Sequence, residues 1–231
     1  MERYTEAENI ASEYRKNYMD GLTALIKRKQ AEKNKERVEN FTKNLGNLEN
    51  ERLEFKKMLG WPLVSGDSHK PSMRIEYIGK DDDAFIFRTF TDVFENYAFY
   101  GILFLKGDTS KEFDVNNIDK KPLVISQHGG LGTPEFCSGI YGDTANYNDM
   151  TRRILKNDVH VFAPQMLIWD PERYKLDFER WDFDRDLKQL GSSITAVEIY
   201  SLQKVLDILS EKPYIDGDKI GMIGLSDGRF Y

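Results

Sequence analysis

The sequence predicts an α/β fold in which antiparallel strands lead into a parallel β-α-β-α-β unit, with a helical extension at the N-terminus. Three observations support this prediction. Residues 2–57 are rich in Glu, Lys, Arg and Asn and contain no proline, residues 73–105 hold short β-rich runs, and buried strands alternate with helical patterns over residues 123–223. Such alternation is typical of a mostly parallel sheet that is covered by helices.

The N-terminal segment predicts two or three amphipathic helices. Its apolar residues recur at helical steps, as in Tyr14, Tyr18 and Leu22, and the charged run over residues 27–37 is typical of a solvated helix face. Gly60-Trp61-Pro62 ends the helical pattern. We therefore expect a helical extension over residues 1–60 and a second domain over residues 61–231.

The second domain begins with residues that predict antiparallel strands. Residues 73–78 and 84–90 have the composition of strands, and the acidic tract at residues 80–83 predicts a hairpin turn between them. Residues 98–105 form a longer β-rich run.

The parallel unit follows. Residues 123–127, 159–163 and 219–223 are short buried strands, and residues 148–156 and 194–209 have helical spacing. Residues 165–192 show no single period and are expected to be an excursion from the core, in which the aromatic residues either line a substrate cleft or pack in the core: Trp169, Tyr174, Phe178 and Trp181.

Composition narrows the function. The chain has 231 residues, 40% of them hydrophobic, with 33 Lys and Arg against 39 Asp and Glu, a net charge of −6 that argues against a nucleic-acid partner. The single cysteine, Cys137, can form neither an internal disulfide nor a cysteine-based zinc site. No run approaches the roughly 18 apolar residues of a membrane span, and no signal peptide is apparent. We expect a soluble, cytoplasmic protein with no cofactor or metal and no membrane partner.

The strongest chemical motif is Gly224-Leu225-Ser226-Asp227-Gly228, directly after the strand at residues 219–223. A serine turned sharply out of a strand sits in strained backbone, and the elbow glycines Gly224 and Gly228 allow the turn. This pattern predicts a nucleophilic serine. The alternative is a glycine-rich turn whose serine only bonds backbone.

A second motif, His128-Gly129-Gly130, follows the strand at residues 123–127. Acyl transfer needs N–H donors directed at the developing oxyanion, and glycines let the backbone approach closely enough to supply them. We interpret His128 as a packed histidine that orders its own loop rather than as a catalytic base. The segment at residues 130–135 also suggests a dinucleotide loop, but it lacks the third glycine.

These motifs resemble a known family. QHGGLG (127–132), VHVFAP (159–164), the helix at residues 193–209 and KIGMIGLSDG (219–228) are similar to the first half of an α/β-hydrolase, and FKKMLGWPL (55–63) resembles the lead-in of the acetyl xylan esterase and dienelactone hydrolase-like branch. The resemblance covers residues 50–231. It implies Ser226 as the nucleophile, and the backbone N–H groups of Asp227 and of Gly129 or Gly130 as the oxyanion hole.

The chain departs from the family after the serine. Members place the triad acid and histidine after the elbow, whereas this sequence ends five residues after Ser226. His160 begins its strand, His69 precedes the sheet and His128 belongs to the oxyanion loop, so none predicts a base. We therefore expect an incomplete α/β-hydrolase domain whose last strand is an exposed edge, poorly stable alone and capable of self-association.

The resemblance implies a serine carboxylic-ester hydrolase that deacylates an acetylated sugar or similar small ester through an acyl-enzyme in the complete protein. One alternative is a catalytically inactive, truncated hydrolase that acts as a binding or scaffold module or has no independent function. The other is a serine peptidase of the prolyl-oligopeptidase type.

Overall fold

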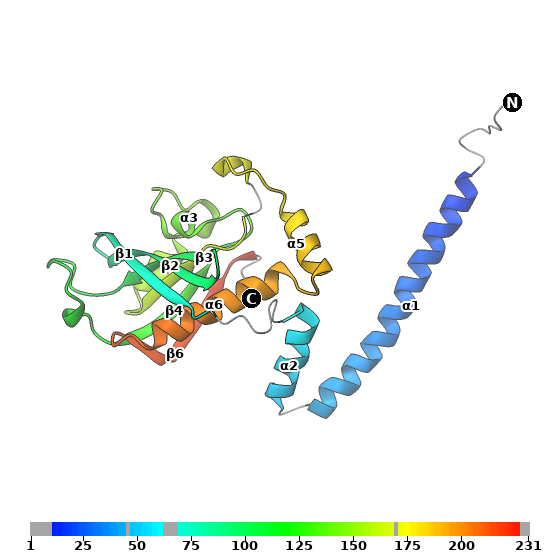
Figure 1. Ribbon diagram of the computed structural model, residues 1–231, viewed down its shortest axis with the longest axis horizontal. Helices are drawn as coiled ribbons and strands as arrows, with labels where there is room; N and C mark the ends of the chain where they lie inside the picture. The colour runs from blue at the N-terminus through cyan, green and yellow to red at the C-terminus, as the bar shows by residue number, and fades with distance from the viewer. Residues whose placement is uncertain (1–10, 45–46, 62–68, 169–170, 227–231) are drawn as a thin grey trace. The chain divides into compact units, whose positions relative to one another are not determined.

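The computed structural model describes residues 11–44, 47–61, 69–168 and 171–226. The chain divides into two compact units, Met1–Phe55 and Lys56–Tyr231. Figure 1 shows the helices and strands of both units and labels most of them.

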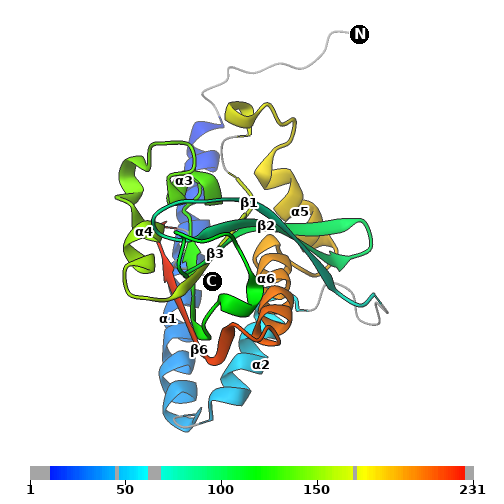
Figure 2. The same ribbon diagram turned by 90° about the vertical axis from the view of Figure 1, so that its left-hand side faces the viewer.

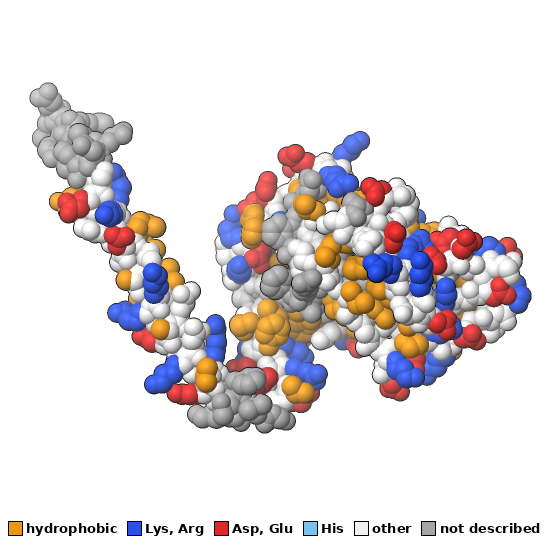
Figure 3. Space-filling model, turned by 180° about the vertical axis from the view of Figure 1, so that it is seen from behind, with side chains coloured by type: hydrophobic (Ala, Val, Ile, Leu, Met, Phe, Trp, Pro, Cys, Tyr) orange, Lys and Arg blue, Asp and Glu red, His pale blue; other side chains and the backbone are white. Residues whose placement is uncertain are grey.

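The first unit is helical. It holds α1 (Ser12–Asn44) and the first residues of α2 (Leu48–Leu59), which ends in the second unit. Neighbouring charges pair along α1, with Lys29–Glu32 and Lys33–Glu36 each at 2.6 Å. Figure 3 shows charged and hydrophobic side chains scattered along this helix, and the predicted apolar stripe is exposed, with Tyr14 72% and Leu22 38% accessible. Exposed ion pairs of this kind each contribute little to the stability of a helix.

The second unit is built on a six-stranded mixed sheet in the order β1-β2-β3-β5-β4-β6. Pairing is antiparallel from β1 to β5 and parallel in β5-β4-β6. The strands are β1 (Ser72–Lys80), β2 (Phe85–Phe94), β3 (Tyr97–Leu105), β4 (Lys121–Gln127), β5 (His160–Pro164) and β6 (Ile215–Gly224). This sheet, with helices on both sides, is a partial α/β-hydrolase fold, as the sequence predicted.

The predicted hairpin between the first two strands is confirmed. Lys80 pairs with Phe85, and the N–H of Asp81 donates to Ala84 O at 3.1 Å. The Asp81 carboxylate also accepts the N–H groups of Asp83 and Ala84, so the acidic tract closes its own turn.

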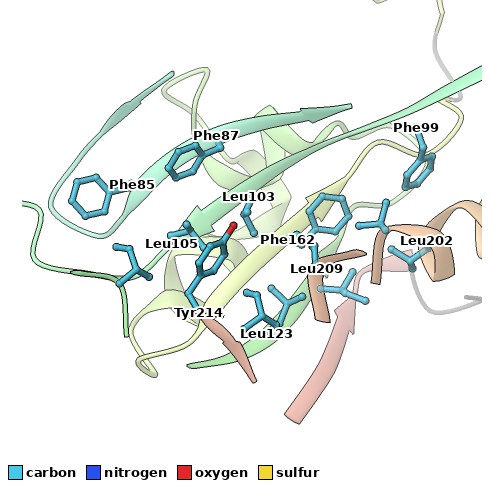
Figure 4. Packing of buried hydrophobic residues seen from close by; sticks show 14 of the residues in the cluster. Phe85, Phe87, Phe99, Leu103, Leu105, Leu123, Phe162, Leu202, Leu209 and Tyr214 are labelled. Carbon is cyan, nitrogen blue, oxygen red and sulfur yellow. The ribbon is translucent and has the colours of Figure 1, made fainter. Parts of the chain in front are cut away.

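Alternating side chains bury both faces of the sheet. On one face α6 (Ile194–Ser210) covers the sheet, and Figure 4 shows Leu202 and Leu209 of this helix near Phe162 and Leu123 of the strands. On the other face α3 (Pro134–Ser138) and α4 (Met150–Leu155) pack over a second core cluster. Figure 2 shows α3 and α4 on one side of the sheet and α6 on the other.

Some local predictions need correction. The helix expected at residues 148–156 is the shorter α4, and residues 165–192 include a helix that periodicity did not indicate, α5 (Arg180–Gln189). The short helix α3 was also missed. Among the described residues, short turns of 3-10 helix are η1 (Val115–Asn117), η2 (Ala145–Tyr147) and η3 (Glu172–Tyr174).

The last strand lies at the edge of the described sheet, where β6 pairs only with β4. Its apolar side chains are accessible, with Ile220 36%, Met222 37% and Ile223 48% exposed. None of the described helices is long and apolar enough to cross a membrane. Within the described ranges, no three His, Cys, Asp or Glu side chains are grouped so as to hold a metal ion.

Candidate active site

Ser226 lies two residues beyond the end of β6, on a backbone turn that is uncommon for a residue with a side chain. Its φ is +56°, and its side chain is exposed. The sheet continues into this turn, because the Leu225 N–H donates to Gln127 O at 3.3 Å. The Ser226 hydroxyl makes no hydrogen bond to any described residue. A non-glycine residue at positive φ is held there by its surroundings, and such strain clusters at functional sites.

The glycine loop after β4 lies directly against this turn. A methyl group added at Gly129 would lie 3.0 Å from Leu225 O and 3.2 Å from Ser226 Cβ. The structure therefore brings the His128-Gly129-Gly130 segment and the serine together, although Gly130 and Ser226 are 96 positions apart in the sequence. The parallel pairing of β4 with β6, in which Gln127 lies opposite Gly224, produces this contact.

The loop is fixed by a tyrosine that sequence reasoning did not single out. The Gly129 N–H donates to Tyr147 Oη at 3.0 Å, and the Gly132 N–H donates to Gly129 O at 2.9 Å. Gly132 has no room for a side chain, since an added methyl would lie 2.0 Å from Tyr147 Oη. Tyr147 is itself buried.

The two candidate oxyanion donors in this loop differ in their partners. The Gly129 N–H is occupied by Tyr147, whereas the Gly130 N–H donates no hydrogen bond within the described part of the chain. Gly130 is also the more accessible of the two. Of the alternatives left open by the sequence, Gly130 is the one whose N–H has no partner among the described residues.

His128 is enclosed by backbone. Its Nδ1 lies 2.7 Å from Gly129 O, and its Nε2 accepts the Met166 N–H at 3.0 Å, so the ring carries its proton on Nδ1. Burial lowers the pKa of His128 below its ordinary value of 6.5, which keeps the ring neutral. The imidazole ties the end of β4 to the segment after β5, and neither nitrogen is left to accept a proton from Ser226.

The other two histidines lie away from the serine. His160 begins β5, where its Nδ1 accepts the Lys106 N–H at 3.0 Å and its Nε2 donates to Tyr214 O at 3.0 Å. The His69 ring contacts Asp92 O near the end of β2, four strands from β6 and hence about 19 Å away at the usual strand spacing.

The single thiol is not part of the site. Cys137 is buried, and its Sγ contacts Pro134 O at 3.5 Å. Burial raises its pKa to about 11, so the thiolate needed for nucleophilic attack does not form near neutral pH.

A cavity of about 920 Å³ opens at the same end of the sheet. Of the aromatic residues singled out in residues 165–192, Tyr174 and Phe178 line it, whereas Trp181 is not among its lining residues and is 66% exposed. Trp169 lies outside the described residues. The cavity also reaches the buried carboxylate of Glu198, which sequence reasoning missed because it sits within the apolar stripe of α6.

Two of the predicted site residues cannot be placed. Asp227, the second predicted oxyanion donor, and Gly228, the second elbow glycine, lie outside the described residues. Gly224 is the last residue of β6.

The fold has counterparts among solved structures. A protein from Bacteroides fragilis NCTC 9343, provisionally assigned as an acetyl xylan esterase, is similar over 77% of this chain and 46% of its own, with a TM-score of 0.60 and 17% identity. The acetyl xylan esterase from Paenibacillus sp. R4 is similar over 76% of this chain and 50% of its own, with a TM-score of 0.47 and 12% identity. The chain thus spans about half the length of these structures. At 17% identity, the similarity to the Bacteroides fragilis protein shows a shared fold alone. No protein-family model and no curated protein matches the chain.

Proposed function

We propose that this chain carries the nucleophile and oxyanion loop of a serine carboxylic-ester hydrolase, which deacylates an acetylated sugar or a similar small ester. The observation that carries the proposal is the contact between an exposed serine at positive φ and the glycine loop, in which the Gly130 N–H has no partner among the described residues. Both features follow parallel strands at the end of the sheet where ligands bind in α/β folds. The shared fold with structures named as acetyl xylan esterases supports the class of protein without fixing its substrate.

In the proposed reaction, Ser226 Oγ attacks the ester carbonyl carbon and loses its proton to a base. The carbonyl oxygen becomes an oxyanion, which the Gly130 N–H stabilises by a hydrogen bond. The Asp227 N–H is the proposed second donor. Collapse of the intermediate breaks the ester C–O bond and releases the alcohol with a proton, leaving an acyl group on Ser226, and water then releases the acid.

The described residues do not supply the general base that the proposed reaction needs. His128 and His160 are engaged through both ring nitrogens, and His69 is about four strand spacings from the serine. A serine hydroxyl without a base is a poor nucleophile near neutral pH. This observation favours the second candidate function, a hydrolase fold that binds a ligand or partner without turnover.

Turnover separates the two candidates. The complete natural protein is assayed for hydrolysis of 4-nitrophenyl acetate and of an acetylated xylose oligomer. The same assays are run on the Ser226→Ala variant and on a control variant, Ser110→Ala, which changes an exposed loop serine. We expect hydrolysis that falls at least about 10³-fold in Ser226→Ala and stays unchanged in Ser110→Ala. Hydrolysis that survives Ser226→Ala contradicts the serine mechanism. Absence of hydrolysis in the full-length protein favours the non-catalytic candidate.

A further inference from the structure

The cavity beside the glycine loop is large for an acetyl group. Its volume of about 920 Å³ lies near the upper end of the roughly 300–1,000 Å³ usual for small-molecule sites. It is bounded by the start of β3, by the first turns of α6, by residues 165–168 and by residues from 174 to 187. All these segments belong to the second unit.

Aromatic rings dominate the walls of this cavity. Phe94, Tyr97 and Phe99 come from the hairpin of β2 and β3, while Tyr174, Phe178 and Phe183 come from the segment after β5. Phe178 and Phe183 meet edge to face, with ring centroids 5.4 Å apart. Rings arranged in this way around an open space offer both faces and edges to another ring.

The charged residues that line the cavity are all acidic. Three glutamates line it, Glu95, Glu135 and Glu198, whereas none of its lining residues is Lys or Arg. Glu135 accepts the Tyr100 hydroxyl at 2.5 Å, and Glu198 accepts the Leu167 N–H at 2.6 Å. These internal donors satisfy oxygens of the two buried carboxylates, so the cavity does not require a cationic ligand. Arg88 and Arg180 lie behind its wall, where they donate to Tyr100 Oη at 3.3 Å and to Leu167 O at 2.5 Å.

The oxyanion loop lies between the cavity and the serine, and neither Gly130 nor Ser226 is among the residues that line the cavity. Gln165 and Met166 line it, and both contact His128 Nε2, at 3.4 and 3.0 Å. Gln165 directly follows β5, which is two strands from β6, so it lies about 10 Å from the serine turn at the usual strand spacing. That span suits a ligand with its carbonyl at Ser226 and a ring in the cavity.

We propose that this cavity binds an uncharged aromatic group, which narrows the substrate of the proposed hydrolase to esters that carry an aryl group. The substrate assignment rests on the proposed function, whereas the binding of the ring rests on the cavity alone. An apolar, aromatic wall suits a neutral ring, and the glutamates in that wall disfavour an anionic one.

Calorimetric titration tests the binding directly, because it needs no turnover. The probe is 2-naphthol, which is neutral at pH 7, and its anionic counterpart is 2-naphthoate; both are titrated into the full-length Ser226→Ala protein. We expect 2-naphthol to bind with a Kd below about 1 mM and 2-naphthoate to bind at least about 10-fold more weakly, because carboxylates face it.

A matched pair of variants locates the site. In the same protein, Phe183→Ala removes a lining ring from α5, and Trp181→Ala removes a ring from the same helix that does not line the cavity. We expect Phe183→Ala to weaken 2-naphthol binding about 5-fold and Trp181→Ala to change it less than about 2-fold. Should Phe183→Ala fail to fold by circular dichroism, Tyr174→Ala makes the same test from another segment.

Two results would overturn the inference: no 2-naphthol binding at 1 mM, or equal effects of the lining and control variants. Binding of 2-naphthol by a protein that turns over no ester keeps the cavity assignment and rejects the hydrolase. Ester turnover by a protein that does not bind 2-naphthol keeps the proposed hydrolase and rejects the cavity assignment.

Discussion

Replacing Gly129 with alanine places a methyl group against the serine turn. The new carbon would lie 3.0 Å from Leu225 O and 3.2 Å from Ser226 Cβ, both shorter than ordinary van der Waals contact. Leu225 O belongs to the backbone and Ser226 is already at positive φ, so relief requires the turn to shift by a few tenths of an ångström. Overpacking of this kind costs about 1–3 kcal/mol, and we expect Gly129→Ala to lower the free energy of unfolding by about 1–2 kcal/mol.

The matched control is Gly221→Ala in β6. Its nearest neighbour would be Val124 Cγ2 at 3.9 Å, an ordinary contact, and Gly221 has no positive φ. Replacing such a glycine is neutral or stabilises by about 0.4–1 kcal/mol, because the unfolded chain loses freedom. Urea denaturation followed by circular dichroism measures both variants. Equal stabilities for the two variants, within about 0.5 kcal/mol, would refute the contact between the glycine loop and the serine turn.

Three further changes probe the same architecture. Tyr147→Phe removes the acceptor of the buried Gly129 N–H, and we expect a loss of about 1–3 kcal/mol in the urea assay; an unchanged stability would mean that this hydrogen bond does not hold the loop. If the chain self-associates through its edge strand, sedimentation velocity should detect larger species as the protein concentration rises. Met222→Lys in this strand should suppress the larger species, whereas the control Leu131→Lys, at a 65% exposed loop residue, should not. A monomer at all concentrations contradicts self-association. Burial lowers the pKa of His128 below 6.5 in the folded state, so the unfolded state takes up the proton first as the pH falls below 6.5, and the folded state loses stability. The His128→Gln protein should therefore lose less stability than the wild type between pH 7 and pH 5. An equal loss in the two proteins would show that His128 does not take up a proton on unfolding.

The sheet was predictable because the strands have a recognisable local sequence pattern. Runs such as residues 98–105 and 123–127 are apolar, rich in β-branched or aromatic residues and bounded by turn residues, and each became a strand within two residues of its predicted ends. The parallel β-α-β-α-β order then determined which strand ends share an edge. That is why the meeting of the glycine loop with Ser226 followed from two motifs.

Other features carried no comparable signal. Helix α5 has charged residues around most of its circumference and buries no residue, so periodicity could not reveal it. Tyr147 reaches Gly129 across 18 residues through a 3-10 turn, a contact that only the folded backbone creates.

Helix α3, by contrast, had a signal that was overlooked. Thr133 caps it by accepting the Phe136 N–H at 3.2 Å, Pro134 occupies its first position, and Gly139 ends it in the left-handed conformation. Thr followed by Pro is a recognisable helix start, but this segment was considered only as a dinucleotide loop, which was set aside for lack of a third glycine.

Site mapping of a covalent adduct tests the central claim most directly. The full-length protein is incubated with a fluorophosphonate probe, digested, and sequenced by tandem mass spectrometry. We predict one modified peptide, with the phosphonyl group on Ser226 Oγ, and no modification of the Ser226→Ala protein. An adduct on a different side chain, formed equally in the alanine variant, would contradict the assignment of Ser226 as the nucleophile.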